Sequence, residues 1–354
     1  MTYAARFLFG PVVLLSLGAC FKQSWGPQNA RGDNDKAAAE DAENPCPSGT
    51  PAPEQGGPIG FAAVDALDQG YTCGGLDAEP IVVTTEEEFE KALHNATPKV
   101  VHFDTAFRGS FDIGSNTTIE GGPHASIKGH LELDGCSNVI VKNVKIVGMN
   151  CTDAPMCKNG SDAITLSSEA HHIWFDHCDI SDGSDGNMDI TEAADYITVS
   201  WTKFWYSSAR PGGHRFANLL GNSDAALTDA GHIHVTFHHD WWADNVSERM
   251  PRVRFGQVHL FDNLYTASGD DYCVGLGVDA SILTENNLFS GVKNPTNASH
   301  ANSNSVLESH GDAYENITGT HDNHGTGVFK PPYPYTLDPV EGVKAAVMSG
   351  AGQH

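Results

Sequence analysis

The stretch Ile173-Trp-Phe-Asp-His177 joins a short apolar run to an acidic residue and a histidine. Similar runs recur along the chain, each rich in β-branched residues and ending near an Asn, Asp or His and an aromatic residue. They are Val139-Ile-Val-Lys-Asn143, Tyr196-Ile-Thr-Val-Ser-Trp201, Ile233-His-Val-Thr-Phe237, Val258-His-Leu-Phe-Asp-Asn263 and Ile282-Leu-Thr-Glu-Asn-Asn287. Short β-branched runs bounded by polar residues predict a series of strands.

The spacing of these runs indicates how the strands are arranged. Successive intervals are 34, 24, 38, 23 and 24 residues when the runs are aligned on Val141, Phe175, Val199, Phe237, Leu260 and Thr284. The short interval fits one rung of a parallel β-helix, and a longer interval fits a rung with an inserted loop. We therefore predict an all-β, parallel β-helix whose insertions, around 147–170, 205–230 and 240–257, project from one side and form the substrate cleft. A β-sandwich is the alternative, although its hairpins would show more two-residue Asn-Gly or Asp-Gly turns.

The N-terminal part of the chain carries different signals. Residues 1–19 have the pattern of a signal peptide, because Arg6 precedes an apolar run that is too short to span a bilayer. Residues 20–56 hold almost no large apolar residues and are expected to form a flexible linker, so the folded domain is expected over 57–354. A helix is predicted over 84–94, since Thr84 and Thr85 precede a run of glutamates.

The signal-like segment ends in Leu17-Gly-Ala-Cys20, which resembles the lipobox of bacterial lipoproteins. This resemblance implies a lipid on Cys20, and an ordinary cleavable signal peptide is the alternative. We expect an exported bacterial protein that is lipid-anchored at the cell envelope or secreted. Export implies disulfides among the eight cysteines, and at least one of the seven that remain after Cys20 is then unpaired. Cys178 is the candidate for a buried free thiol, whereas Cys151 and Cys157 could close a short loop.

Charge is distributed unevenly along the chain. The formal net charge is -25, which argues against a nucleic-acid partner because phosphate binding needs a basic face. Yet Arg249-Met-Pro-Arg-Val-Arg254 concentrates three arginines, and Asp185-Gly-Asn-Met-Asp189 places two carboxylates four residues apart. Such neighbouring clusters suit chemistry on an acidic polymer, with a divalent ion bridging protein and substrate.

Histidine and tryptophan clusters each allow two interpretations. His232, His234 and His238 have the spacing to share one face of a strand, so a transition-metal site is one interpretation. Polar ends of a β-helix face are favoured instead, because no fourth ligand is in view. Trp205, Trp241 and Trp242 either stack on sugars or pack between rungs.

The ordered motifs resemble those of the pectate lyases of polysaccharide lyase family 1, from about Gly60 to the end of the chain. The resemblance is carried by Trp174-Phe-Asp-His177, Asp185-Gly-Asn-Met-Asp189, Ile197-Thr-Val-Ser200, Arg249-Met-Pro-Arg-Val-Arg254, Phe255-Gly-Gln-Val-His259 and Pro331-Pro-Tyr-Pro-Tyr-Thr-Leu-Asp338. It implies a right-handed, single-stranded parallel β-helix. It also implies a monomeric calcium-dependent lyase that cleaves 1,4-linked galacturonan, as polygalacturonate or pectin, by β-elimination to 4,5-unsaturated oligogalacturonides.

The resemblance also implies roles for particular residues. Arg249, which opens the R-x-P-x-x-R motif, is implied to be the catalytic residue, and Arg254, which closes it, to bind the substrate carboxylate. Calcium is implied to be held by three aspartates, namely Asp162 of Asp162-Ala-Ile164, Asp185 and Asp189.

One position departs from the family pattern. The family often places a substrate-binding lysine in H-x-K-x-x-L-x-G, whereas this chain reads His214-Arg-Phe-Ala-Asn-Leu-Leu-Gly221, with Phe216 in the lysine position. Arg215 and Arg252 are expected to be additional substrate-binding cations. Strand alternation would, however, turn Arg215 to the face opposite Phe216.

The chemistry explains why both clusters are needed. Elimination removes a proton α to a carboxylate, so the enolate-like intermediate carries two negative charges, which calcium and arginines offset. An arginine base is unusual, because a guanidinium keeps its proton up to about pH 12 unless neighbouring cations weaken its hold. The alternatives are a pectin lyase, a glycoside hydrolase with an acid pair drawn from Asp182, Asp185 and Asp189, and a surface lipoprotein that binds pectic chains without cleaving them.

Overall fold

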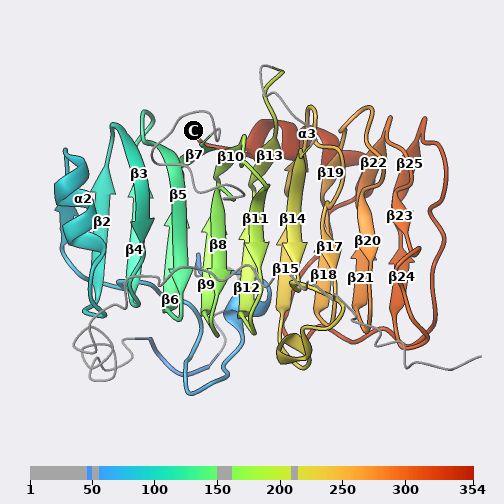
Figure 1. Cartoon of the computed structure of the whole chain (residues 1–354), viewed down its shortest axis with the longest axis horizontal. Coiled ribbons are helices and arrows are strands. Elements are labelled where there is room, and N and C mark those ends of the chain that lie inside the picture. Colours follow the sequence, from blue (N-terminus) through green and yellow to red (C-terminus); the bar gives the residue numbers. More distant parts are fainter. Residues whose placement is uncertain (1–45, 50–55, 150–161, 209–213) are drawn as a thin grey trace, which may run out of the picture.

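The computed structural model describes residues 46–49, 56–149, 162–208 and 214–354. Its strands lie side by side along one long axis and follow one another in chain order, so that the molecule is a stack of rungs (Figure 1). Neighbouring rungs pair in parallel. The parallel β-helix predicted from the spacing is confirmed.

The strands of the described residues form two sheets. Ten strands build the first: β1 (Pro80–Val82), β2 (Lys99–Phe103), β4 (Thr117–Gly121), β6 (Ser137–Lys142), β9 (His171–Asp176), β12 (Asp195–Ser200), β15 (His234–His238), β18 (Gln257–Phe261), β21 (Ser281–Glu285) and β24 (Val306–His310). The second sheet has two branches that meet at one long strand, β5 (Ser126–Asp134), which also pairs with β3 (Ala106–Asp112).

The two branches give each rung a second and a third side. The β8–β23 branch holds β8 (Ile164–Ser167), β11 (Gly186–Ile190), β14 (Phe216–Leu220), β17 (Arg252–Val253), β20 (Val274–Leu276) and β23 (Thr296–Asn297). The β7–β25 branch holds β7 (Lys145–Gly148), β10 (Asp179–Ser181), β13 (Lys203–Trp205), β16 (Trp241–Trp242), β19 (Leu264–Tyr265), β22 (Leu288–Ser290) and β25 (Ala313–Glu315). Each rung therefore has three sides around one core.

The register of the ten-stranded sheet matches the alignment made from sequence. The six residues used for that alignment, from Val141 to Thr284, are direct cross-strand partners in consecutive rungs. The same column continues to Ile119 and Val101 on one side and to Ser309 on the other. Four of its members, Phe175, Val199, Phe237 and Leu260, are 0% exposed. Burial of this inward column fixes the register, because a slip of one residue would turn every apolar side chain outwards.

Aromatic rings stack along the interior from rung to rung. The ring centroids of Trp242 and Tyr265 are 4.6 Å apart, and those of Tyr265 and Phe289 are 4.2 Å apart. Phe204 and Tyr314 extend this stack at its two ends. Trp242 is 0% exposed, so the packing interpretation is confirmed for this residue. Trp205 and Trp241 are half-buried, and each lies under the ammonium group of Lys203.

Buried amides support the bends between the ten-stranded sheet and the β7–β25 branch. The backbone N–H of Asp240 donates to Asn263 Oδ1, that of Asn263 to Asn287 Oδ1, and that of Asn287 to Asp312 Oδ1. These bends leave buried N–H groups without strand partners, and the stacked side chains satisfy them.

Both ends of the described chain cover sides of the stack, over the ten-stranded sheet and the β7–β25 branch. At the N-terminal end, the 3₁₀ turn η2 (Phe61–Ala63) donates backbone N–H groups to Thr236 and Thr198. The final segment, residues 327–354, returns along the stack and is called here the C-terminal strap. It includes α3 (Val340–Gly350), which Figure 1 shows near β19 and β22. Val343 and Val347 of this helix pack on Leu264 and Leu288 of the β7–β25 branch. The β8–β23 branch is left as the side on which a site can form.

The strap ends beside the N-terminal rungs. The backbone N–H of Gly352 donates to Trp201, and the backbone N–H of His354 donates to Asn143 Oδ1 at 2.8 Å. Gln353 donates to backbone carbonyls of Gly122 and Ala125. The strap therefore ties the last residues of the chain to rungs formed some two hundred residues earlier.

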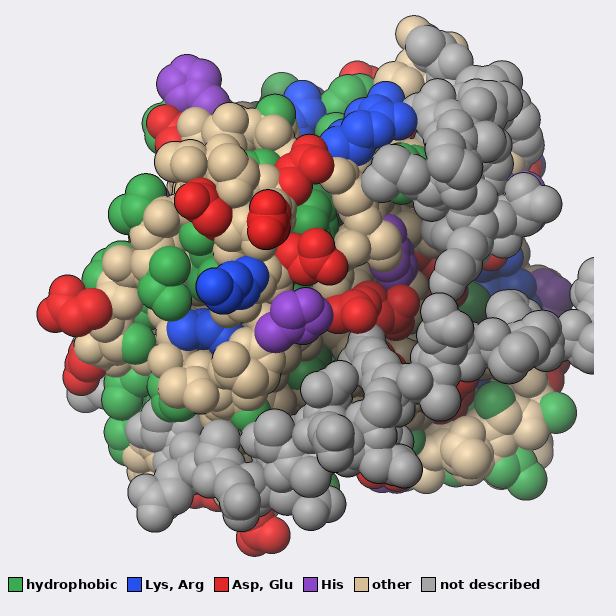
Figure 2. All heavy atoms as spheres, turned by 60° about the vertical axis from the view of Figure 1, so that its left-hand side comes forward, with side chains coloured by type: hydrophobic (Ala, Val, Ile, Leu, Met, Phe, Trp, Pro, Cys, Tyr) green, Lys and Arg blue, Asp and Glu red, His purple; other side chains and the backbone are tan. Residues whose placement is uncertain are grey.

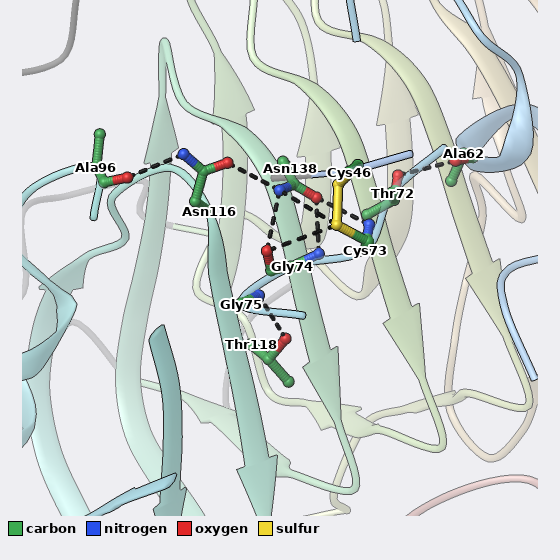
Figure 3. The surroundings of a disulfide bond; sticks show 10 residues. All are labelled: Cys46, Ala62, Thr72, Cys73, Gly74, Gly75, Ala96, Asn116, Thr118 and Asn138. Atoms are coloured by element: carbon green, nitrogen blue, oxygen red, sulfur yellow. Dashed lines mark hydrogen bonds between the residues drawn. A yellow bond between two sulfur atoms is a disulfide. The ribbon is translucent and has the colours of Figure 1, made fainter. Parts of the chain in front are cut away.

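One disulfide joins the predicted linker to the folded domain. Cys46 is bonded to Cys73, and the N–H groups of Cys73 and Gly74 donate to Asn138 of β6 (Figure 3). The ordered part thus reaches back at least to Cys46, although the domain boundary near residue 57 itself stays a prediction. Cys178 is a buried free thiol, as predicted, and so is Cys273. Cys151 and Cys157 lie outside the described residues.

The predicted first helix forms with the expected cap. The helix α2 (Glu86–Leu93) has Thr85 as N-cap, with Thr85 and Glu88 in a reciprocal capping box. It buries Phe89 and Leu93 and closes the N-terminal end of the stack (Figure 1). The second 3₁₀ turn of the described chain is η3 (Leu227–Asp229). No helix in these ranges has the length and apolar character to cross a bilayer.

Candidate active site

The three predicted calcium ligands lie at the start of two neighbouring strands of the β8–β23 branch. Asp162 precedes β8, Asp185 precedes β11, and Asp189 lies within β11. Because β8 and β11 pair in parallel, the starts of both strands meet at the same edge, and the carboxylates are brought together. Strand alternation turns Asp189 outwards between the buried Met188 and Ile190.

Asp162 and Asp189 flank a glycine that leaves room for a ligand. A Cβ on Gly186 would lie 2.8 Å from Asp162 Oδ1 and 3.5 Å from Asp189 Oδ1. Asp162 is buried, and no described group hydrogen-bonds its Oδ1. A buried carboxylate oxygen without a partner beside a second carboxylate fits a hard cation, so the residues present are compatible with calcium.

The electrostatics of this pair also favour a cation. Burial raises the pKa of Asp162, and the negative charges of Asp189 and Asp185 raise it further. Burial likewise raises the pKa of Asp189, while the nearby charge of Arg249 opposes that rise. Without a cation the two carboxylates therefore hold on to protons, and a bound divalent ion would replace those protons.

Two histidines that the sequence argument did not assign lie against the aspartates. His214 Nδ1 is 2.7 Å from Asp185 Oδ1, and His130 Nδ1 is 2.8 Å from the backbone carbonyl of Asp162. Burial acts to lower the pKa of His130, but its contacts with Glu132 and Asp162 outweigh burial, so that this pKa is raised. Of these two histidines, only His214 had a signal in the sequence, because it is the first residue of the segment that was compared with the family motif.

Arg249 lies across the ring of the residue that stands in the family lysine position. Its guanidinium carbon is 4.0 Å from the centroid of the Phe216 ring, and the His214 ring packs on the same Phe216 at 4.7 Å. Arg249 has a φ of 65°, and a cis peptide bond joins the next two residues, Met250 and Pro251. Arg249 Nε is buried, and no described group accepts from it. Phe216 thus orients the guanidinium through its ring face and adds no charge of its own.

Arg252 shares an outward-facing column with Asp189. Leu219 pairs with both residues, so Asp189 and Arg252 lie two rungs apart, or roughly 10 Å between backbones. Burial lowers the pKa of Arg252, as do the positive charges of Arg254 and Arg249. Within the described residues, Arg252 Nε has no hydrogen-bond partner. This guanidinium is available for an anion on the sheet surface.

Arg254 is more strongly held by the protein than the sequence indicated. Its Nε donates to Asp224 Oδ1 at 2.5 Å, and its Nη1 donates to the carbonyls of Gly221 and Asn222. Asp224 follows the stretch that was compared with the family motif, and it was not predicted as a site residue. A substrate carboxylate at Arg254 would share the guanidinium with these partners.

Arg215 lies one residue before Phe216 and is half-buried. Its backbone carbonyl accepts hydrogen bonds from the N–H and hydroxyl of Ser247, and no described group accepts from its buried Nε. Its role in binding substrate stays a prediction.

The other clusters noted in the sequence have structural partners. His232 and His234 both face Asp195, at 3.5 Å and 2.8 Å, whereas His238 stacks on Phe261 at 4.9 Å. These three histidines do not form a joint metal site. Asp182 accepts from the backbone N–H of Ser207, so its carboxylate supports a loop.

The fold and the site together define a β-helical protein that holds carboxylates and guanidinium groups side by side on one open sheet. On the face seen in Figure 2, Lys and Arg side chains are few and lie among Asp and Glu side chains. A local group of arginines is therefore an exception in a chain of net charge -25. Such an arrangement can bind an anionic polymer through a cation and arginines.

The chain belongs to the pectate lyase family, whose model, described as "Pectate lyase", matches residues 56–353. It is 36% identical over 218 residues to a pectate trisaccharide-lyase of Thermotoga maritima, covering 59% of this chain and 57% of that protein. It is 29% identical over 316 residues to a pectate trisaccharide-lyase of Bacillus licheniformis, covering 83% of this chain and 85% of that protein. The matched part thus spans little more than half of the Thermotoga relative.

Solved structures show the same fold. A pectate lyase from Bacillus sp. N165 in complex with trigalacturonate superposes with a TM-score of 0.71 at 23% identity, covering 84% of this chain and 99% of that one. A mutant of Bacillus subtilis pectate lyase superposes with a TM-score of 0.68 at 22% identity, covering 83% and 96%. The fold predicted from the repeat is therefore that of known pectate lyases.

Proposed function

We propose that this protein is a calcium-dependent pectate lyase that cleaves 1,4-linked galacturonan by β-elimination. The observation that carries the proposal is the pair formed by Asp162 and Asp189, whose oxygens flank Gly186 beside the guanidinium of Arg249. Family membership and the trigalacturonate bound to a structural relative support the same substrate class.

In this proposal the chain's own residues position the substrate and accept its proton. Asp162, Asp185 and Asp189 would hold Ca²⁺, which when bound offsets negative charge on the uronate carboxylate. Arg252 and Arg254 bind and orient carboxylates of the polymer. Arg249, oriented by the Phe216 ring, accepts the C5 proton in its neutral form while the C5–H electron pair forms the C4–C5 double bond and the glycosidic oxygen leaves from C4.

The test follows the unsaturated product on polygalacturonate. Absorbance of the conjugated uronide should rise with calcium present and should stop rising after a chelator is added. Activity that survives the chelator, or a strong preference for methylated pectin, would identify a pectin lyase instead. Reducing sugar without unsaturated product would identify a hydrolase, and binding without any product would leave a pectin-binding protein.

The apparent affinity for calcium should increase with pH. Burial and mutual repulsion raise the pKa values of Asp162 and Asp189, so both carboxylates hold protons near neutrality when calcium is absent. Calcium must displace those protons, and the apparent affinity should therefore rise as pH increases through this range and fall below it. Calorimetric titrations with Ca²⁺ in buffers of different ionisation enthalpy should register the released protons. Binding without proton release would contradict this assignment.

Replacing Arg254 by alanine should weaken substrate binding at least as much as turnover. The guanidinium is a carboxylate ligand in this proposal, so we expect KM to rise about tenfold, or about 1.4 kcal/mol. Initial rates over a range of polygalacturonate concentrations separate KM from kcat. Because Asp224 holds Arg254, Asp224→Asn is the companion variant and should alter KM less. A pure fall in kcat for Arg254→Ala would assign this residue to the chemical step.

We further propose that Cys20 carries lipid and that residues 21–45 tether the domain to the cell envelope. The support is the Leu17-Gly-Ala-Cys20 stretch followed by a polar segment. A disulfide in the folded part is consistent with export. The end of the tether opposite Cys20 would then join the domain at Cys46, which is bonded to Cys73.

Replacing Cys20 by serine should release the protein from membranes without changing the activity of the purified domain. The physical reason is that the acyl chains supply the membrane affinity. Fractionation of cells and intact-mass measurement test the lipid. Mild proteolysis should trim the chain towards residue 57 under reducing conditions, and it should leave a disulfide-linked peptide under oxidising conditions. A Cys20→Ser protein that stays in membranes, or a mature chain without acyl groups, would refute the anchor.

A further inference from the structure

A second group of potential ligands lies where the C-terminal strap crosses two rungs. His239 follows β15 and Asp262 follows β18, so they occupy equivalent bends in consecutive rungs, and both have left-handed backbone conformations with φ of 57° and 55°. The third member, Asp338, belongs to the strap just before α3. Three separate segments of the chain thus meet at one point, away from Asp162 and Asp189 on the β8–β23 branch.

The distances in this group suit a small divalent cation. His239 Nε2 is 3.4 Å from Asp338 Oδ2 and 3.9 Å from Asp262 Oδ2, and the three ligand atoms all lie within 4.8 Å of one another. Donors around a tetrahedral zinc ion lie about 3.3 to 3.5 Å apart, since each bond is about 2.0 to 2.2 Å long. Small rotations of the half-exposed Asp338 would therefore complete the geometry.

Asp262 of this group is buried without a Lys or Arg partner among the described residues. The Asp262 side chain is 0% exposed, and its Oδ2 accepts from the backbone N–H of Asp338. No described group hydrogen-bonds its other oxygen, Oδ1, and no Lys or Arg of the described ranges forms a salt bridge with Asp262 or Asp338. A buried carboxylate of this kind normally has a positive partner or a metal.

The imidazole has the partner that a metal ligand needs. His239 Nδ1 is 3.0 Å from Nδ1 of His238, a buried residue, and His239 can donate a hydrogen bond to His238 there. That tautomer leaves the lone pair of His239 Nε2 directed at the two carboxylates. The indole of Trp201 stacks on the His239 ring with centroids 4.2 Å apart and fixes its plane. An outer hydrogen bond and a fixed ring are typical of metal-binding histidines.

We propose that His239, Asp262 and Asp338 form a second metal site, which takes a first-row divalent cation such as zinc and fastens the strap to the β-helix. One imidazole and two carboxylates favour zinc over calcium, because calcium prefers oxygen ligands throughout. Solvent reaches the site past Asp338, whose side chain is 49% exposed, so water supplies the remaining ligand. The site is separate from catalysis and does not depend on the proposed lyase activity.

The test uses the purified protein, first stripped with chelator and then kept in excess CaCl₂ so that oxygen sites are filled. Titration with Zn²⁺ by calorimetry, and with Co²⁺ by visible absorbance, should reveal one site. Asp338→Asn removes a ligand at the exposed side of the group and should weaken binding at least thirtyfold. Asp322→Asn, a change at an exposed residue of the same C-terminal region, is the matched control and should bind within twofold of the unmodified protein.

Thermal unfolding gives an independent readout. Zinc at one hundred times the Kd of the unmodified protein should raise the Tm of that protein by about 5 °C and the Tm of Asp338→Asn by no more than about 2 °C. The rate of polygalacturonate cleavage in calcium should be the same for all three proteins, which separates this site from the catalytic one. Equal zinc affinity in the unmodified protein and Asp338→Asn, or no zinc binding in calcium, would overturn the proposal.

Discussion

Replacing Arg249 by lysine should reduce kcat on polygalacturonate by about a thousandfold, or about 4 kcal/mol in the barrier. Lysine keeps the positive charge, but it loses the planar guanidinium that lies on the Phe216 ring at 4.0 Å. A compact ammonium on a flexible stem cannot keep both this contact and the direction of its proton-accepting atom. Initial rates at saturating calcium and substrate measure the effect.

Two controls make the Arg249 result interpretable. Arg108→Lys, a remote change in β3, should keep full activity and so exclude a general effect of losing a guanidinium. Thermal unfolding of Arg249→Lys should remain within a few degrees of the unmodified protein, because Phe216 and its neighbours stay in place. If the variant folds and keeps activity within tenfold, Arg249 does not perform the chemical step.

Replacing Asp189 by asparagine should weaken calcium binding by roughly a hundredfold, about 2.7 kcal/mol, and abolish cleavage at micromolar calcium. The change removes one of the two carboxylates that flank Gly186, and with it the repulsion that raises the pKa of Asp162. The remaining carboxylate pair offers too little charge to hold calcium at the same concentration. Calcium titration by calorimetry and rates over a wide calcium range measure both effects.

Asp182→Asn is the informative companion to Asp189→Asn. Its carboxylate accepts from the backbone of Ser207, so we expect calcium affinity close to that of the unmodified protein and activity within a fewfold. A hydrolase that used Asp182 as an acid or base would instead lose nearly all activity in this variant. Normal calcium binding by Asp189→Asn would remove Asp189 from the metal site and leave the calcium assignment without its main support.

The register of the fold was predictable because it repeats. Five of the six aligned rungs place an apolar residue at the same inward position and the sixth places Thr284 there, so the alignment from Val141 to Thr284 recovered true cross-strand partners. Helix α2 was equally predictable, since the two residues of its capping box lie three positions apart in the sequence. Periodic and local patterns predict contacts between residues whose spacing along the chain is regular or short.

Contacts made once, between distant segments, left no such pattern. His214 meets Asp185 across 29 residues, and Arg254 meets Asp224 across 30, and neither spacing is repeated. The histidine run drew attention to His232, His234 and His238, whereas the group proposed as a second metal site takes His239 from the end of that run and two aspartates from elsewhere. The path of the strap brings Asp338 to His239 and Asp262, and no sequence pattern near Asp338 predicts that path.

The strap also determines where the polypeptide ends are displayed. Residue 354 contacts Asn143, and the disulfide at Cys73 lies against Asn138, so both ends of the folded part leave the molecule beside the single strand β6. A fluorescent protein fused after His354 would therefore sit near the rungs where Cys46 joins the fold, and far from the other end of the stack, with β23 to β25. A probe added after His354 would therefore report on the N-terminal rungs, although His354 follows the C-terminal rungs in the sequence.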